Sequence, residues 1–216
     1  MRARTADWNL ASDILAIRLP NATTEMTADR KLVKHYHEPG DLHELTFSCY
    51  QRRPLLDDDK SRILLCESID RAISGHDFRL VAFVLMPEHV HLLVCPMEPK
   101  PEIDKLLFAI KRPFSYRIKK HLEKTGDPRL AELTVRERPG KVTFRFWEEG
   151  GGYDRNISQG RTIQASIDYI HQNPVRRGLT NRARDWKWSS CRWYESDKQI
   201  VDRDLPTIHG LPDLVS

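Results

Sequence analysis

Short apolar runs and alternating segments along the chain predict strands. The run Phe78–Met86 (FRLVAFVLM) is nearly continuous, which is typical of a buried strand. Pro87 interrupts the pattern and His89–Cys95 (HVHLLVC) resumes it, so two strands joined by a tight turn are expected. Glu44–Tyr50 (ELTFSCY) is rich in strand-forming residues, and Val142–Trp147 (VTFRFW) alternates between its two faces. Each of these two segments predicts a further strand.

Helical periodicity marks other parts of the chain. Asp57–Ser74 has apolar residues at helical spacing after an acidic start, and Gly75 is expected to end that helix. Lys105–Leu122 is amphipathic, with apolar residues on one side and basic residues on the other. A last helix is predicted from Ser158 to about Asn173, closed by Pro174 because proline lacks the N–H that a helix interior needs.

The order of these elements is strand, helix, strand, strand, helix, strand, helix. It predicts an α+β fold in which helices cover one face of an antiparallel sheet. Residues 124–138 are expected to form a charged connector. We assign residues 1–40 to an N-terminal extension, residues 41–195 to the main domain and residues 196–216 to a C-terminal tail.

The composition fits a soluble protein. Of the 216 residues, 39% are hydrophobic and 31% are charged, which is ordinary for a globular domain. No apolar run approaches the roughly 18–20 residues of a membrane helix, and the first ten residues lack the apolar core of a secretory signal. We therefore expect a cytoplasmic protein with no membrane partner.

The four cysteines are far apart and form no CxxC pair; they are Cys49, Cys66, Cys95 and Cys191. This spacing argues against a zinc ribbon and against a disulfide framework. We interpret them as buried or incidental free thiols.

Basic residues exceed acidic ones by 35 to 31, which permits nucleic-acid binding without requiring it. The basic residues that cluster are Lys111, Arg112, Arg117, Lys119 and Lys120 in one segment, and Arg176 and Arg177 in another. A solvated helix face explains such clusters as readily as a phosphate-binding surface does. Charge alone leaves the partner open.

The segment His89–His91 (HVH) carries the clearest chemical signal. Side chains two apart on a strand point to the same face, so both imidazoles should project together while Val90 packs opposite. Imidazole pairs suit first-row metals and leave room for oxygen ligands. Two strand histidines that only form hydrogen bonds are the alternative. A second such motif, His35–His37 (HYH), lies in a poorly patterned segment before Pro39, and we interpret it as a chance occurrence.

Tyr169 and Asn173 form a second candidate pair on the last predicted helix. At about 100° per residue, Ile163, Ile167 and Ile170 form a stripe that should face the sheet. Tyr169 and Asn173 are four residues apart, so they share a face beside that stripe. The arrangement would suit a tyrosine nucleophile beside an amide oxygen ligand. A partly exposed packing tyrosine is the alternative.

Taken together, the two features resemble a known family. The motif PEHVHLLV, followed about 80 residues later by YIHQNPVRRG, is similar to the HUH single-tyrosine transposases, including their REP-associated and IS200-like groups. The order of elements resembles their ferredoxin-like core with an added tyrosine helix. RFWEEGGGYDRNI resembles the segment that precedes that helix, and the resemblance spans roughly residues 44–194.

The resemblance implies a site and a chemistry. It makes His89 and His91 ligands of a divalent metal ion, Mg²⁺ or Mn²⁺, with Asn173 where the family places a third polar ligand. Tyr169 would attack single-stranded or hairpin DNA, giving a 5′-phosphotyrosine and a free 3′-OH, which is strand transfer and not hydrolysis. The clustered basic residues would hold the phosphate backbone. Tyr116 and Trp147 would either stack on unpaired bases or pack in the core.

Three functions stay open at this point. The first is a transposase that nicks and rejoins single-stranded DNA, or a domesticated REP-associated version of it. The second is a hairpin-binding protein without cleavage. The third is a metal-dependent phosphoesterase that uses water, in which Tyr169 would be dispensable while His89 and His91 would not. A monomer and a homodimer are equally compatible with the sequence, as is a Tyr169 that serves a partner's site.

Overall fold

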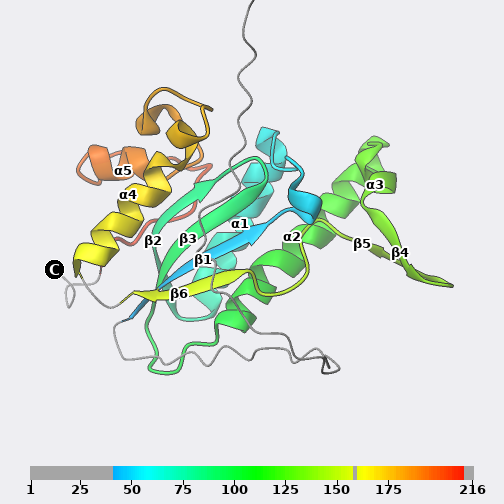
Figure 1. The fold of residues 1–216 in the computed structure, drawn as a ribbon, viewed down its shortest axis with the longest axis horizontal. Coiled ribbons are helices and arrows are strands. Elements are labelled where there is room, and N and C mark those ends of the chain that lie inside the picture. Colours follow the sequence, from blue (N-terminus) through cyan, green and yellow to red (C-terminus); the bar gives the residue numbers. More distant parts are fainter. Residues whose placement is uncertain (1–40, 158–159, 212–216) are drawn as a thin grey trace, which may run out of the picture. The chain divides into compact units, whose positions relative to one another are not determined.

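A four-stranded antiparallel sheet lies at the centre of the structure, a computed structural model that describes residues 41–157 and 160–211 (Figure 1). Its strands are β1 (Leu42–Ser48), β2 (Phe78–Leu85), β3 (His89–Pro96) and β6 (Tyr153–Ile157), in the spatial order β2-β3-β1-β6. The first three agree with the predicted strands to within about two residues at each end. The N-terminal extension and its motif His35–His37 lie outside the described residues.

Two helices, α1 (Asp59–Gly75) and α2 (Ile103–Thr125), cover one face of the sheet. The side chain of Asp58 accepts a hydrogen bond of 2.8 Å from the backbone N–H of Ser61, which caps the start of α1. Gly126 has a φ of 66° and ends α2 in the left-handed conformation that favours glycine. The predicted positions of both helices are therefore confirmed, including the end of α1 at Gly75.

A third helix, α4 (Gly160–Arg176), covers the opposite face. Ile163, Ile167 and Ile170 face the sheet and pack with buried residues of β1, β2, β3 and β6, as the helical spacing predicts. The predicted end at Asn173 is wrong, because α4 continues past Pro174 to Arg176. Pro174 lacks the N–H that would bond to Ile170 O, so the helix loses one hydrogen bond there and ends two residues later.

The segment between α2 and β6 differs most from the prediction. The residues expected to form a connector contain a short helix, α3 (Arg129–Glu132), and a strand, β4 (Thr134–Arg138). β4 pairs with β5 (Lys141–Phe144) in a separate two-stranded ribbon, so the first part of the predicted strand 142–147 lies outside the central sheet. Its end still meets the end of β1, because Trp147 forms an isolated bridge with Cys49, the residue after β1. Gly140 has a φ of 78° in the turn between them, a conformation that Pro-Gly turns supply readily. The fourth strand of the sheet is β6, which the hydrophobic pattern did not reveal.

The residues after α4 close the free edge of β2. The backbone of Leu85 donates to Trp188 O at 2.8 Å, and that of Ser190 donates to Phe83 O at 3.1 Å. His209 donates to Leu80 O at 2.8 Å, so residues beyond 195 also bond to this edge. Covering an edge in this way removes a template for pairing with other chains. Two short helices lie in this segment after α4, η2 (Ala183–Asp185) and α5 (Cys191–Glu195). A third, η1 (Tyr50–Arg52), follows β1.

The four cysteines are buried and free, as predicted. Burial raises the pKa of Cys49 to about 12, which keeps its thiol protonated and unreactive near neutral pH. In the part of the chain that the structure describes, no helix is both long enough and apolar enough to cross a membrane.

Candidate active site between the sheet and helix α4

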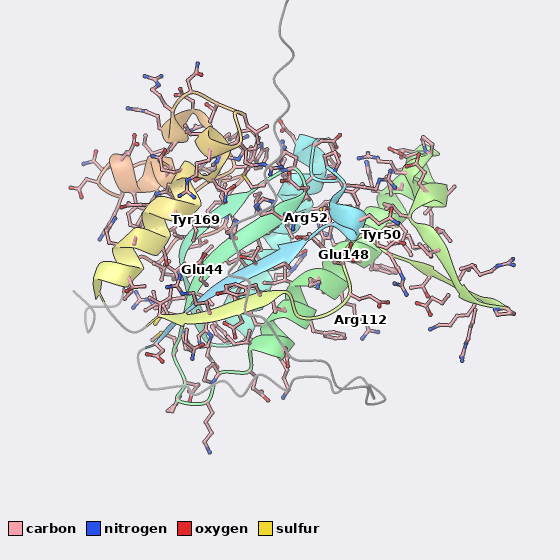
Figure 2. All side chains as sticks on the ribbon, in the orientation of Figure 1. Glu44, Tyr50, Arg52, Arg112, Glu148 and Tyr169 are labelled. Atoms are coloured by element: carbon pink, nitrogen blue, oxygen red, sulfur yellow. The ribbon has the colours of Figure 1, made fainter. Side chains whose placement is uncertain are left out.

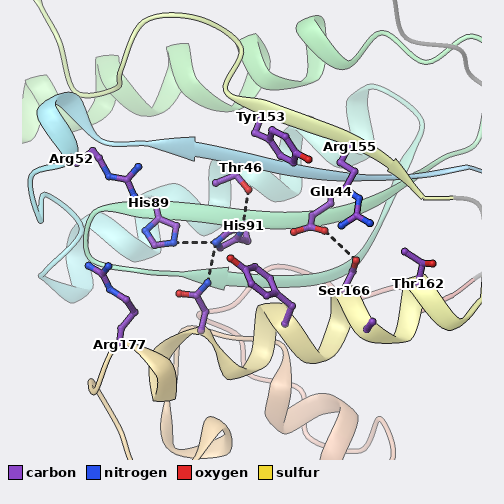
Figure 3. A pocket seen from close by; sticks show the side chains of 13 residues that line it. Glu44, Thr46, Arg52, His89, His91, Tyr153, Arg155, Thr162, Ser166 and Arg177 are labelled. Atoms are coloured by element: carbon purple, nitrogen blue, oxygen red, sulfur yellow. Dashed lines mark hydrogen bonds between the residues drawn. The ribbon is translucent and has the colours of Figure 1, made fainter. Parts of the chain in front are cut away.

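A pocket of about 610 Å³ opens between the sheet and α4, on the face away from α1 and α2 (Figure 3). Its lining residues come from β1, η1, β3, β6, α4 and the residue after α4. They are Glu44, Thr46, Arg52, His89, His91, Tyr153, Arg155, Thr162, Ala165, Ser166, Tyr169, Asn173 and Arg177. The structure thus gathers the two histidines, the tyrosine and the asparagine that the sequence singled out.

His89 and His91 project from β3 into this pocket while Val90 packs in the core on the other face. Their Nε2 atoms lie 3.0 Å apart, and both residues are buried. The outer nitrogens are also paired: Nδ1 of His89 lies 3.1 Å from Glu88 Oε1, and Nδ1 of His91 lies 2.8 Å from Thr46 Oγ1. A proton on each Nδ1 leaves both Nε2 lone pairs converging on one point, the arrangement of a metal-binding pair with its outer-shell partners.

The electrostatics of the pair favour the neutral, ligand form of imidazole. Burial, and then the charges of His89 and Arg176, lower the pKa of His91 to about 3. Burial also lowers the pKa of His89, although the neighbouring Glu88 carboxylate opposes the shift. Both rings are therefore neutral near pH 7, which is the state that binds metal.

The donor set limits what cation the site could hold. Within the described residues, no group of three or more His, Cys, Asp or Glu side chains is placed to hold a metal ion. Nδ2 of Asn173 lies 3.1 Å from His91 Nε2, and turning the amide by 180° would present Oδ1 at that position. Two imidazoles, one amide oxygen and substrate or water oxygens suit a first-row divalent ion.

Tyr169 stands at the mouth of the pocket, on α4 (Figure 2). Its ring centroid lies 5.6 Å from that of His91, and 40% of the residue is exposed, so a polymer substrate can reach the hydroxyl. The guanidinium carbon of Arg176 lies 4.3 Å from the centroid of the tyrosine ring. The guanidinium thus packs over the face of the tyrosine ring as a cation–π contact.

Further arginines surround the pocket, and the sequence pattern missed two of them. Arg52, Arg155 and Arg177 all line it (Figure 3). Arg177 also donates to Glu88 Oε1 at 2.8 Å, which links it to the partner of His89. Arg52 lies in a turn and Arg155 in a strand with no apolar alternation. The sequence signals were the basic run Gln51–Pro54 for Arg52 and, for Arg155, the segment RFWEEGGGYDRNI that resembles the family.

The structure separates the predicted DNA-binding residues into two groups. Arg176 and Arg177 lie beside the pocket, whereas the basic residues of α2 lie with that helix on the other face of the sheet. Three of the basic residues on α2 form ion pairs with glutamates. Arg117 pairs with Glu67, and Lys119 and Lys120 both pair with Glu123. Lys111 and Arg112 lie beside the glycines that precede β6. Their roles in binding DNA stay predictions.

The two aromatic residues considered for base stacking have opposite surroundings. Trp147 is buried, with its ring centroid 5.1 Å from that of Phe47, so it packs in the core. Tyr116 is 63% exposed on α2.

The family model described as "Transposase IS200 like" matches residues 42–131, which run from β1 to α3 and include both pocket histidines. The match ends before α4. A Haemophilus influenzae protein provisionally named a REP-associated tyrosine transposase is 26% identical over 117 residues, covering 53% of this chain and 60% of the relative. The REP-associated tyrosine transposase of Escherichia coli K12 is 24% identical over 127 residues, covering 59% and 62%. The chain thus spans about three fifths of the length of these relatives.

Among solved structures, a similar fold occurs in a chain titled as a REP-associated tyrosine transposase bound to a REP hairpin. The TM-score is 0.57 over 85% of this chain and 98% of that chain, with 19% sequence identity. At this identity the likeness concerns the fold, and it confirms the predicted α+β architecture. It extends beyond the residues that the family model matches.

Proposed function

We propose that the chain is a member of the IS200-like transposase family, whose model matches residues 42–131, and that it nicks and rejoins single-stranded DNA beside hairpins through a 5′-phosphotyrosine on Tyr169. One observation carries the proposal. The exposed tyrosine of α4 shares a pocket with two converging, neutral imidazoles and with Asn173. A structural tyrosine has no need of such neighbours, whereas a nucleophile at a phosphate does.

A divalent cation, Mg²⁺ or Mn²⁺, would be held by Nε2 of His89 and His91, and by the oxygen of Asn173 once its amide is turned. Such an ion would neutralise charge on the scissile phosphate and polarise it toward attack. Thr46 and Glu88 would hold the histidine rings through their outer nitrogens.

The chemical step transfers the phosphate to the enzyme. The hydroxyl oxygen of Tyr169 forms a bond to phosphorus, the P–O3′ bond breaks, and the leaving oxygen takes up a proton to become a free 3′-OH. The tyrosine proton passes to solvent at the open mouth of the pocket, and the Arg176 guanidinium packs over the tyrosine ring. Attack of a 3′-OH on the phosphotyrosine reverses the step, so no bond energy is lost to hydrolysis.

The arginines around the pocket would hold the DNA backbone. Arg52, Arg155 and Arg177 come from three different elements, so they can contact phosphates on either side of the one that is attacked. The solved relative carries a REP hairpin; for this chain we propose hairpins with an unpaired flank as the substrate class.

The test is a cleavage assay on labelled hairpin DNA from repeats that flank the gene, with Mn²⁺ or Mg²⁺, run on a denaturing gel that retains covalent adducts. We expect an adduct with the wild type and none with Tyr169→Phe or His89→Ala. Cleavage that survives Tyr169→Phe would overturn the tyrosine mechanism in favour of a phosphoesterase that uses water. If the wild type bound hairpins tightly but did not cleave them, the result would indicate a hairpin-binding protein without nuclease activity.

A further inference from the structure

Helix α2 carries aromatic and basic residues in alternation along its solvent-exposed side. Phe108, Arg112, Tyr116 and Lys120 follow one another at intervals of four residues, and we call them the α2 stripe. Residues four apart are neighbours on a helix surface, so the four side chains form a continuous track. Phe108 is 59% exposed and Tyr116 is 63% exposed.

The position of the stripe excludes a role in the core. The buried residues of α2 lie on the side that packs against the sheet and α1; they are Ile103, Leu106, Leu107, Ile110, Phe114, Ile118 and Leu122. At about 100° per residue, the stripe lies on the opposite side of the helix. A single exposed aromatic residue needs no explanation, but here a cation lies beside each ring. The guanidinium carbon of Arg112 is 5.2 Å from the Phe108 centroid, and Lys120 Nζ is 6.0 Å from that of Tyr116.

A hollow of about 410 Å³ runs beside the first half of the stripe and reaches the glycines before β6. Phe108, Lys111 and Arg112 line it on the helix side, and Gly150 and Gly151 line it on the other. Nζ of Lys111 donates to Gly150 O at 2.8 Å, so this basic residue ties the glycine segment to α2.

The glycine segment connects the hollow to the candidate active site. Gly152 leads directly into Tyr153, which is 59% exposed and lines the pocket on the other face of the sheet. A Cβ on Gly152 would lie 2.2 Å from Thr46 O, and its φ is +86°, so this position requires glycine to approach β1 closely. Gly150, Gly151 and Gly152 carry no side chains of their own, so a strand that passes here meets their backbone together with Lys111, which bonds to Gly150 O, and Asp104, whose Oδ1 would lie 3.5 Å from a Cβ on Gly151.

We propose that the α2 stripe binds the unpaired DNA strand that leaves the active-site pocket across Gly150–Gly152. Bases would stack on Phe108 and Tyr116, and phosphates would contact Arg112 and Lys120. The inference rests on the proposed function, because it takes DNA as the substrate. Single-stranded DNA fits better than duplex, since base faces are free for stacking only when unpaired. The cations beside the rings favour a polyanion over an apolar protein surface.

The first experiment measures binding without cleavage, in the Tyr169→Phe background. Fluorescence anisotropy of a labelled oligothymidylate would be compared between this protein and one that also carries Phe108→Ala and Tyr116→Ala. We expect the dissociation constant to rise about ten-fold or more, because each stacked base is lost. Phe108→Trp with Tyr116→Trp should restore binding. Val142→Ala, which removes an exposed side chain from the β4–β5 ribbon, is the matched control and should not weaken it.

The salt dependence separates the phosphate contacts from the stacking contacts. For single strands each phosphate contact contributes about 0.7 to the slope of log affinity against log salt. Arg112→Gln should lower the slope by about that amount. Lys120→Gln should lower it less, because Lys120 also bonds to Glu123 at 2.8 Å. The double aromatic variant should keep the slope and lose affinity at every salt concentration.

Two results would overturn the inference. One is an unchanged affinity for oligothymidylate in the double aromatic variant. The other is an equal loss of affinity for a blunt hairpin without an unpaired flank, which would assign the stripe to duplex DNA. Neither result depends on nicking by the wild type. A protein that binds single strands through the stripe but forms no adduct would refute the proposed function and keep this inference.

Discussion

The face of the sheet under α1 and α2 and the face under α4 are built from alternate residues of the same strands. On β3, Val90 and Leu92 pack into the core beneath α1 and α2, whereas His89 and His91 line the pocket beside α4. On β1, Phe47 faces the first side and Thr46 the second. The first face carries the larger cluster of buried apolar side chains, whereas the second combines a smaller apolar cluster with buried polar groups that stability alone does not require.

The difference follows from how completely each face is covered. Two helices of 17 and 23 residues cover the first face. One helix of 17 residues covers the second, and its isoleucine stripe packs there with buried residues that include Ala82, Val84 and Leu93. Beside α4 the sheet stays open over β1 and β6, and this is where the pocket forms (Figure 1). Incomplete cover leaves polar side chains within reach of a substrate.

The strongest test of this comparison is the removal of one oxygen from the open face. Tyr169→Phe should reduce covalent nicking by about a thousand-fold or more, because the nucleophile is lost. The free energy of unfolding should change by less than about 0.5 kcal/mol, since the side chain is exposed. Adduct formation on a denaturing gel and urea denaturation measure the two quantities. Tyr50→Phe, outside the pocket, serves as the control, and nicking lost equally in both variants would contradict the assignment.

Two neighbouring residues of β3 allow the faces to be compared directly. Leu92→Ala should lower the free energy of unfolding by about 2–5 kcal/mol, because it leaves a cavity in the core. Nicking per folded molecule should persist. His91→Ala should abolish metal-dependent nicking with a smaller loss of stability. If both variants lost activity only in proportion to unfolding, the two faces would not differ as described.

A smaller effect is expected from the outer partner of His89. Glu88→Gln keeps the shape of the side chain but removes the carboxylate that pairs with His89 Nδ1 and with Arg177. The metal concentration for half-maximal nicking should rise about 10- to 100-fold, as for other outer-shell substitutions. Glu132→Gln, at an ion pair with Arg53 outside the pocket, should leave it unchanged. An unaltered metal requirement in Glu88→Gln would argue against a metal on His89.

The last effect, which disappears near neutral pH, concerns pH and the attachment of α4. His171 is buried, its Nε2 lies 2.8 Å from Ser190 Oγ, and burial lowers its pKa to about 4. Below about pH 6.5, the usual pKa of histidine, His171 is protonated in the unfolded chain but stays neutral in the folded chain. The contribution of His171 to the free energy of unfolding is therefore fully present above about pH 6.5. It falls by about 2–3 kcal/mol at most as the pH drops to about 4. Urea denaturation at several pH values should show a shallower fall in His171→Gln, and parallel curves would contradict the account.

Local periodicity was enough to predict the main elements and two pairs of residues in the pocket. The twofold period of a strand places His89 and His91 together, and the helical period places Tyr169 beside Asn173. These relations hold within one element, so they can be worked out from the sequence. The extension of α4 past Pro174 shows the limit, since packing of the whole helix can outweigh the single hydrogen bond that a proline removes.

Strand pairing decided the rest, because it joins residues that are far apart in the chain. β6 (YDRNI) has no apolar alternation, and it becomes a strand through its antiparallel pairing with β1, where Leu42 lies opposite Ile157. The same register brings Arg155 to the pocket. The pairing of β1 with β3 places Thr46 opposite His91, so that the Thr46 hydroxyl becomes the hydrogen-bond partner of the His91 ring. Local periodicity therefore shows which side chains share a face. Which faces meet follows from register and helix docking, since both depend on contacts across the whole domain.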